Sequence, residues 1–115
     1  MDLRLTPEQE QLVGAFASLY AKEATPERVR AAETSPDTAL WDRLRQIGVV
    51  DMAVGESAGG WGASLLDLAL VAEQQGRSLA PAPVVETQTA VRLLEQLGAG
   101  RAAECVTGAL AGDVL

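Results

Sequence analysis

The amino-acid sequence predicts an all-α fold, a bundle of five to six helices with one glycine-rich loop. Apolar residues recur at the three- and four-residue spacing of helices over most of the 115 residues. Helix-start signals alternate along the chain with glycines suited to helix ends. Because 48% of the residues are hydrophobic, the chain has enough apolar surface for a core. We therefore expect residues 1–115 to form a single helical domain.

The first helix has the clearest start signal. Thr6 stands at the N-cap position, Pro7 at the first helical position, and Gln9 at the place from which its side chain completes a capping box. The helix is predicted from about Pro7 to about Ala24. Its apolar face comprises Leu12, Val13, Phe16, Leu19 and Tyr20.

Two further helices follow at proline-containing signals. Thr25-Pro26-Glu27 repeats the cap and proline pattern and predicts a short helix to about Glu33. Ser35-Pro36-Asp37-Thr38 separates it from a third helix that carries Leu40, Trp41, Leu44 and Ile47. This helix should stop at Gly48, a residue suited to the left-handed conformation.

The middle of the chain loses the helical periodicity. Val49 to Val54 is predicted as an extended, strand-like segment, and the glycine-rich loop Gly55 to Gly62 follows it. Ser64, with Asp67 three residues later, predicts the start of a fourth helix that ends near Gln75, before Gly76. Since this helix is apolar on nearly every side, we expect it at the centre of the bundle.

Two helices complete the prediction. Pro81 and Pro83 mark a connection to a fifth helix, which carries Val84, Val85, Val91, Leu94 and Leu97 and ends at Gly98. The sixth is predicted from about Arg101 to Leu110, with its end near Gly112.

The composition excludes several classes of function. No histidine is present and Cys105 is the single cysteine, so we expect no catalytic triad, no metal site and no internal disulfide. A net charge of −7 with scattered basic residues argues against nucleic acid and against a membrane surface. The lone cysteine and the absence of a signal-like start favour a cytoplasmic protein.

Two glycine motifs resemble active-site signatures. Gly55-Glu56-Ser57-Ala58-Gly59 matches the nucleophile elbow G-x-S-x-G, but Ser57 has no histidine to activate it. Gly60 to Leu65 opens like a dinucleotide fingerprint but lacks its third glycine. We interpret both as turns, and we expect neither a catalytic nor a cofactor-binding residue here. Glu73 is expected to be partly buried beside Arg77.

The order of the segments resembles the N-terminal helical domain of acyl-CoA dehydrogenases. The matching stretches are Leu5-Thr6-Pro7-Glu8-Gln9, the helix around Trp41 that ends in Ile47-Gly48-Val49, and Ala53-Val54 leading into Gly59-Gly60-Trp61-Gly62. Ala72 to Pro81 is similar to the family segment EELGRALAP, and Gly108 to Asp113 to its LASGE stretch. These pieces together extend over essentially the whole chain.

The resemblance implies an FAD-dependent oxidoreductase that oxidises the Cα–Cβ bond of an acyl-CoA thioester and passes electrons to an acceptor. It implies that the flavin contacts and the catalytic carboxylate belong to a β-domain and a C-terminal helical domain that this chain lacks, so the chain alone should be inactive and bind no FAD. It also implies a homo- or hetero-oligomer. This domain would contribute helix packing and one wall of the acyl-chain cavity, through Pro81, Ala82, Val85, Glu86 and Thr89.

The chain departs from the family at its loop. The family usually has V-P-E-x-Y/F-G-G-x-G, where this chain has Gly55 for the proline and Ala58 for the aromatic residue. Both changes are expected to loosen the loop. Two other functions stay open: a non-enzymatic interaction or partner-subunit module derived from this domain, and a small-ligand carrier with its cavity between the fourth and fifth helices.

Overall fold

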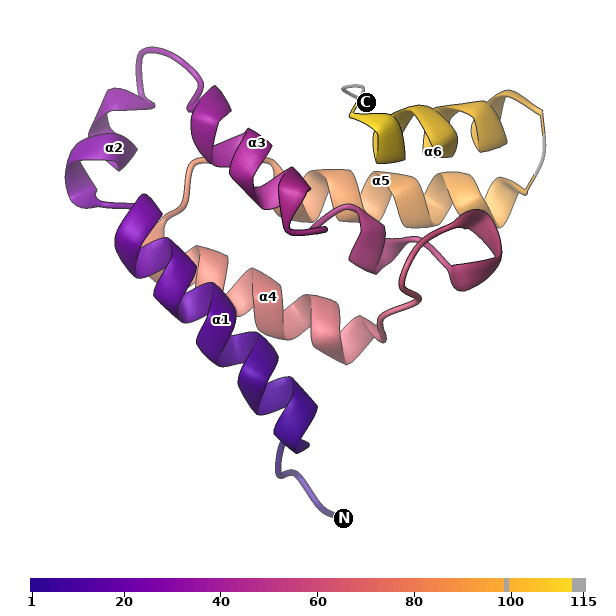
Figure 1. Cartoon of the computed structure of the whole chain (residues 1–115), viewed down its shortest axis with the longest axis horizontal. Helices are drawn as coiled ribbons and strands as arrows, with labels where there is room; N and C mark the ends of the chain where they lie inside the picture. Colours follow the sequence, from indigo (N-terminus) through magenta and orange to yellow (C-terminus); the bar gives the residue numbers. More distant parts are fainter. Residues whose placement is uncertain (99, 113–115) are drawn as a thin grey trace. The chain divides into compact units, whose positions relative to one another are not determined.

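The computed structural model describes residues 1–98 and 100–112, and it confirms the all-α class (Figure 1). The described residues form six α-helices and two short 3-10 helices, with no strand. They fall into two compact units, residues 1–40 with 65–82, and residues 41–64 with those from 83 onward. The helix α3 (Thr38–Gln46) contributes residues to both units.

Helix α1 (Pro7–Glu23) begins with the predicted capping box. The Thr6 hydroxyl accepts a hydrogen bond from the Gln9 N–H at 3.1 Å, and the Gln9 side-chain oxygen accepts one from the Thr6 N–H at 3.0 Å. Two of the N–H groups that a helix start leaves without intrahelical partners are thereby satisfied. The start of α1 is confirmed to the residue.

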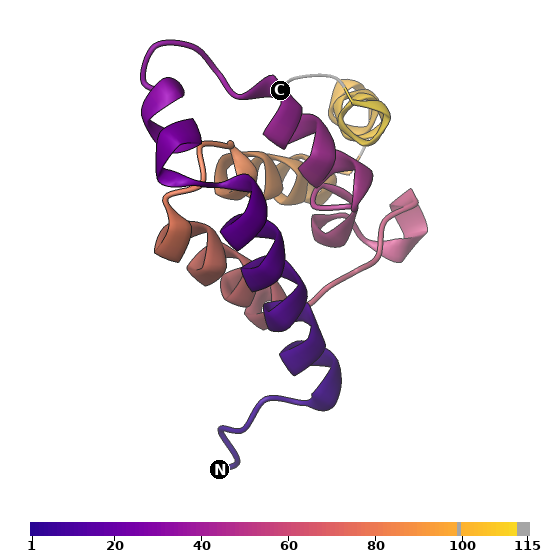
Figure 2. The ribbon, with the colours of Figure 1, turned by 60° about the vertical axis from the view of Figure 1, so that its left-hand side comes forward.

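The first unit is built on the packing of α1 along α4 (Leu65–Ser78), which lie side by side in both ribbon views (Figures 1 and 2). Phe16 and Tyr20 of α1 are buried, as are Leu68 and Val71 of α4. A polar contact supplements this apolar packing, because the Gln9 side-chain amide donates to the Asp67 carboxylate at 3.2 Å.

Helix α4 corrects two sequence predictions. It continues through Gly76 to Ser78, and the left-handed residue at its end is Leu79, with φ +53°. Its N-terminal turn is not buried, since the side chains of Leu65 and Leu66 are 69% and 54% exposed. One face of α4 packs on α1, whereas apolar composition alone predicted burial on all sides.

The turn after α4 explains why the helix continues past Gly76. The Gln75 side-chain amide donates to the carbonyl of Ala82 at 2.6 Å, and the Ala80 N–H donates to the Gln75 carbonyl at 3.1 Å. These bonds hold the turn that reverses the chain, so the end of the helix is set by residues 79–82. A glycine inside a helix costs only about 1 kcal/mol relative to alanine, which this turn outweighs.

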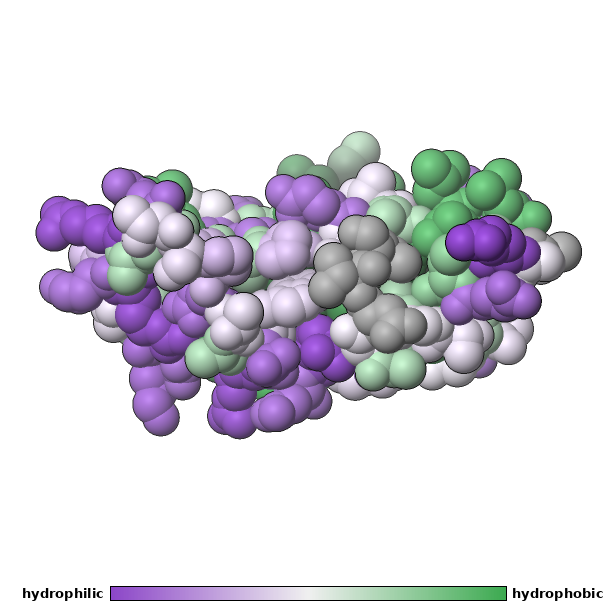
Figure 3. All heavy atoms as spheres, turned by 90° about the horizontal axis from the view of Figure 1, so that it is seen from above, coloured by the Kyte–Doolittle hydropathy of each residue, from purple (hydrophilic) through white to green (hydrophobic). Residues whose placement is uncertain are grey.

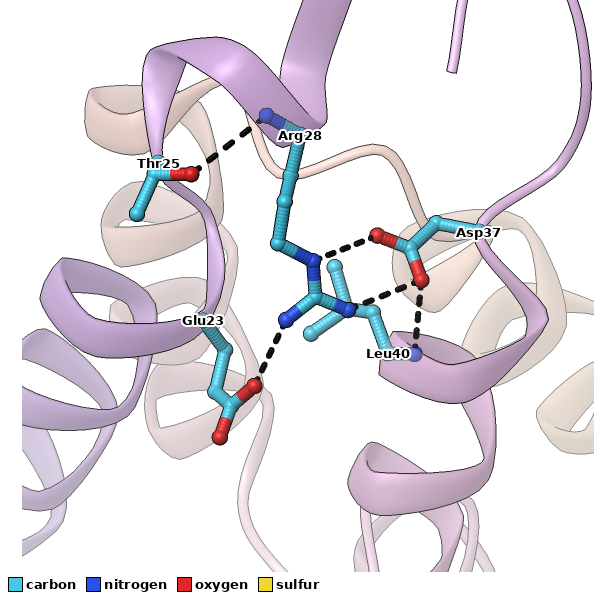
Figure 4. A network of polar contacts seen from close by, with 5 residues as sticks. All are labelled: Glu23, Thr25, Arg28, Asp37 and Leu40. Atoms are coloured by element: carbon cyan, nitrogen blue, oxygen red, sulfur yellow. Dashed lines mark hydrogen bonds and ion pairs between the residues drawn. The ribbon is translucent and has the colours of Figure 1, made fainter. Parts of the chain in front are cut away.

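A network around Arg28 joins α1, α2 (Pro26–Ala31) and the start of α3 (Figure 4). The Arg28 guanidinium donates to both oxygens of the Asp37 carboxylate, at 2.9 and 3.0 Å, and to the Glu23 carboxylate at 2.6 Å. The Asp37 carboxylate also accepts from the Leu40 N–H at 2.9 Å, so it caps α3. Neither the ion pairs nor this cap was anticipated from the sequence.

The second unit contains no strand among its described residues, so the prediction for Val49 to Val54 is wrong. The segment forms turns and the 3-10 helix η1 (Asp51–Ala53), with local bonds such as Met52 N–H to the Gly48 carbonyl at 3.0 Å. The carbonyl of Val49 accepts from the buried Gln88 side chain at 2.8 Å. A strand needs a neighbouring strand for its backbone groups, and here side-chain and local partners satisfy them instead.

Helices α5 (Val84–Leu97) and α6 (Arg101–Ala111) pack on each other in the second unit (Figures 1 and 2). The helices end at Gly98 and Gly112, as predicted, and both glycines have positive φ. The core of this unit consists mainly of small aliphatic side chains and includes Leu44, Val49, Val54, Val84, Val91 and Val106.

Tyr20 carries a buried hydroxyl with no hydrogen-bond partner among the described residues. The residue is 1% exposed, and burial raises the pKa of Tyr20 to about 12. A buried hydroxyl without a partner costs free energy, because it has lost its bonds to water.

The Tyr20→Phe variant should therefore raise the free energy of unfolding by about 1 kcal/mol, in contrast to the usual loss when a bonded tyrosine hydroxyl is removed. The ring packing against Phe16, with centroids 6.0 Å apart, is retained. Urea unfolding of both proteins measures the difference. As a control, Tyr20→Leu removes the ring and should destabilise; a Phe variant less stable than the parent would show that the hydroxyl has a partner.

Candidate functional site

The glycine-rich loop folds back on η1 through its own backbone. The N–H groups of Trp61, Gly62 and Ala63 donate to the carbonyls of Asp51, Val54 and Met52 at 2.9, 2.8 and 3.0 Å. The Gly60 N–H donates to the Gly55 carbonyl at 3.0 Å. The C-terminal half of the loop is therefore closed onto η1 by its own backbone N–H groups.

Two glycines of this unit are required by close packing. A Cβ on Gly48 would overlap the ring of Trp61, and φ at Gly48 is +94°. A Cβ on Gly60 would lie 2.5 Å from the carbonyl carbon of Val54 and closer still to its oxygen. Trp61 thus anchors the loop on Gly48, although 54% of the residue stays exposed.

The serine of the G-x-S-x-G motif lies outside any elbow. Ser57 is exposed in the 3-10 helix η2 (Glu56–Ala58), and another 3-10 helix, not a strand, precedes it. A nucleophile elbow needs a strand before the serine and a helix directly after it. The motif is a turn whose Gly59 adopts φ +94°.

Glu95 joins the loop to α5. Both oxygens of the Glu95 carboxylate lie 3.0 Å from the Gly55 N–H, which donates to them. A Cβ on Gly55 would collide with the same carboxylate. A side chain at position 55 would therefore displace the Glu95 carboxylate from its place beside the loop.

A pocket of about 390 Å³ lies between the loop and α5, and we call it the Arg92 pocket. The loop side is formed by Ala53, Gly55, Gly62 and Ala63, and the helix side by Arg92, Glu95 and Gln96. The pocket was not predicted from the sequence. The one sequence pattern that indicates it is the spacing of Arg92 and Gln96, which places two polar side chains on one face of α5.

A second, more apolar pocket of about 230 Å³ lies at Ala58. It is lined by Ala58, Leu94, Glu95, Gly98, Ala103, Val106 and Thr107. Glu95 borders both pockets. The family resemblance predicts an aromatic residue at position 58. This chain has Ala58 there, and Ala58 lines this pocket.

The five residues expected to form a cavity wall are at least partly accessible. Pro81 and Ala82 lie in the turn after α4 in the first unit and are half-buried. Val85, Glu86 and Thr89 are exposed on α5 in the second unit, on one side of that helix. Exposure of Val85 is 43%, which leaves this small side chain available for a contact.

Other singled-out residues have ordinary structural roles. Glu73 pairs with Arg77 at 3.1 Å, as expected, but the expected partial burial is wrong because its side chain is 55% exposed. Cys105 is half-buried within α6. In the described part of the chain, no cluster of three or more acidic or cysteine side chains is arranged to hold a metal ion.

The four backbone N–H groups from Gly60 to Ala63 do not offer a site for the pyrophosphate of a flavin dinucleotide. Pyrophosphate binding needs backbone N–H groups that face the ligand. The N–H groups of Gly60, Trp61, Gly62 and Ala63 are all bonded to carbonyls of the same unit. No helix within residues 1–98 and 100–112 is both long and apolar enough to cross a membrane.

Comparisons with known proteins identify the family of the chain. The family model of the acyl-CoA dehydrogenase N-terminal domain matches residues 6–105. The chain is 40% identical over 89 residues to acyl-CoA dehydrogenase IpdE2 of Mycobacterium tuberculosis, a match that covers 73% of the chain and 28% of that protein. It is 38% identical over 98 residues to IpdE2 of Mycolicibacterium smegmatis, covering 82% and 32%. No solved structure matches it significantly.

Proposed function

Because the chain belongs to the acyl-CoA dehydrogenase family, through that family's N-terminal domain, we propose that it serves as this domain in a flavin-dependent acyl-CoA dehydrogenase. The observation that carries the proposal is the match of the family model over residues 6–105. The reaction is the α,β-oxidation of an acyl-CoA thioester, an oxidoreductase activity with an electron-transfer acceptor. The chain spans about a third or less of the length of the relatives it matches.

We assign no catalytic or flavin-binding residue to this chain. The N–H groups from Gly60 to Ala63 are bonded to backbone carbonyls, and no described carboxylate residue is buried. We propose that other segments of the enzyme hold the flavin and supply the base that removes the α-proton. The contribution of this chain is positional, through helix packing and part of the acyl-chain cavity.

The cavity wall is proposed to consist of Pro81, Ala82, Val85, Glu86 and Thr89. The support is their accessibility: all five are exposed or half-buried, whereas Val84, Gln88 and Val91 of the same helix are buried in the second unit. A wall residue must keep its side chain available to the substrate. Val85 is the best placed to limit chain length, since it is apolar and small.

In the full enzyme, Val85→Trp is expected to lower kcat/KM for long acyl-CoA substrates by at least about tenfold while sparing short ones, because one methylene in a pocket is worth about 1 to 3 kcal/mol. Steady-state kinetics over a series of acyl-chain lengths measures the effect.

Leu93→Trp is the matched control, since Leu93 lies two turns further along α5 and is 59% exposed. It should leave the chain-length profile unchanged. An unchanged profile in a folded, flavin-loaded Val85→Trp enzyme would remove Val85 from the cavity wall.

A second candidate function is that of a non-enzymatic partner subunit. The exposed apolar side chains of α5 favour an interaction role: Leu93 and Leu97 are 59% and 66% exposed. Figure 3 shows hydrophobic side chains gathered on the surface toward the right, where α5 and α6 lie. Sequencing the reading frame beyond Leu115 separates the two functions, because the enzyme requires a β-rich segment and a later helical bundle.

A further inference from the structure

The Arg92 pocket contains a guanidinium without an internal counter-charge. Among the described residues, no carboxylate pairs with Arg92, even though Glu95 lies one turn away on the same helix and borders the same pocket. Arg28 and Arg45, by contrast, both pair with carboxylates. Arg92 is half-buried, and no described carboxylate forms an ion pair with it.

The reason for the missing pair is the orientation of Glu95. Both of its carboxylate oxygens lie 3.0 Å from the Gly55 N–H and are directed to that donor. The negative charge is thus engaged in holding the loop. The i, i+3 pairing with Arg92 that helix spacing would allow is not made.

The donors of the pocket converge from one helix face. Arg92 and Gln96 are separated by four residues, so their side chains leave α5 on the same side and both line the pocket. Guanidinium groups form paired hydrogen bonds with carboxylates and phosphates, and a glutamine amide supplies a further neutral donor. The volume of about 390 Å³ falls in the range of small-molecule sites.

We propose that the Arg92 pocket binds a small organic oxyanion, a carboxylate or a phosphate group carried by a compact molecule. Arg92 binds the anionic group, Gln96 donates a second hydrogen bond, and the loop residues Gly62 and Ala63 enclose the body of the ligand. The site is distinct from the proposed cavity wall, which uses other residues of α5, and it does not depend on that proposal.

The net charge of −7 opposes anion binding only weakly at this place. At physiological salt, exposed charges more than about 8 Å apart are largely screened, so the nearest charges decide the local potential. Of the residues that line the pocket, Arg92 carries the guanidinium that attracts the anion and Glu95 the carboxylate that repels it. The Glu56 side chain lies beside Gly62 and adds a second negative charge near the loop side. Arg92 and Glu95 should therefore have opposite effects on affinity.

The test is a titration of the isotope-labelled chain with sodium acetate and, separately, with inorganic phosphate, followed by NMR. Saturable shifts are expected at the amides of Gly55 and Gly62 and at the side-chain amide of Gln96. The anion that binds more tightly identifies the group recognised. If neither anion gives saturable shifts at these positions, the proposal is overturned.

Three variants distinguish binding at a specific site from nonspecific electrostatic attraction between the anion and the protein. Arg92→Gln should weaken binding by at least about tenfold, because it removes charged hydrogen bonds. Arg101→Gln makes the same charge change at an exposed position at the start of α6 and should alter affinity less than about twofold. Equal losses in both variants would contradict the proposal.

Glu95→Gln covers the case in which an Arg92 variant fails to fold. The glutamine keeps an oxygen for the Gly55 N–H but removes the opposing charge, so binding should tighten severalfold. Weaker binding in a folded Glu95→Gln protein would contradict the assigned roles.

Discussion

Replacing Gly60 with alanine is expected to destabilise the chain by about 3 kcal/mol or more, since a Cβ there overlaps backbone atoms in a packed loop. The obstacle is the Val54 peptide, whose carbonyl carbon would lie 2.5 Å from the new methyl group. Val54 is fully buried, and its carbonyl accepts from the Gly62 N–H at 2.8 Å. Neither side of the contact has room to move without breaking the loop.

Urea or thermal unfolding measures this loss, and two other glycines give matched controls. Gly14 and Gly76 lie inside helices with no atom within 4 Å of an added Cβ. Alanine at either position should raise the free energy of unfolding by about 0.5 to 1 kcal/mol, because alanine favours the helix. A Gly60→Ala protein as stable as the parent would show that the loop packs differently.

Replacing Asp37 with alanine is expected to lower the free energy of unfolding by about 2 to 3 kcal/mol. The change removes the cap of α3, typically worth about 1 kcal/mol, together with the paired bonds to Arg28. Asp37 is mostly shielded, with 13% of its side chain exposed, so solvent replaces these contacts poorly. Equilibrium unfolding at neutral pH is the measurement.

Two further variants separate the contributions of the helix cap and of the ion pair to the stabilisation by Asp37. Asp37→Asn keeps an acceptor for the Leu40 N–H but loses the charge, so it should fall between the parent and Asp37→Ala. Asp42→Ala removes an ion pair of α3 whose carboxylate side chain is 61% exposed, and it should cost less than about 0.5 kcal/mol. If Asp42→Ala lowered the free energy of unfolding as much as Asp37→Ala, the network around Arg28 would stabilise the protein no more than an exposed ion pair does.

The Asp37 contribution should also depend on pH. Hydrogen bonds from Arg28, and then from the Leu40 N–H, lower the pKa of Asp37 below its ordinary value of 3.8. The folded protein therefore holds the ionised form more strongly than the unfolded chain does. The difference in stability between the parent and Asp37→Ala should be full above pH 3.8 and shrink as the pH falls through the lower folded pKa.

The helix starts and ends that rest on local chemistry were predictable. The capping box at Thr6 and Gln9 is satisfied by atoms within one turn, so its outcome does not depend on the rest of the fold. The same holds for the left-handed conformation of Gly48 and for the helix end at Gly98. The family resemblance was likewise readable, because its motifs are short and keep their order along the chain.

The errors fall where distant contacts compete with local preference. Val49 and Val50 have strand-forming side chains, but the Val49 carbonyl bonds to Gln88, thirty-nine residues away. The expected end of α4 at Gly76 gave way to a turn held by the Gln75 side chain. In both cases a hydrogen bond to a residue outside the local pattern decided the backbone conformation.

By itself the sequence determined the helical class, the helix caps and the family, since each depends on neighbouring residues or on their order. Only the tertiary structure decided why Gly55 and Gly60 lack side chains, which carboxylates hold Arg28, and that Arg92 is left unpaired within the described residues. The physical reason is that a hydrogen bond or a steric contact is made between atoms brought together by folding. Glu95 and Gly55 are forty residues apart in the sequence, and no local sequence pattern predicts that they form a hydrogen bond.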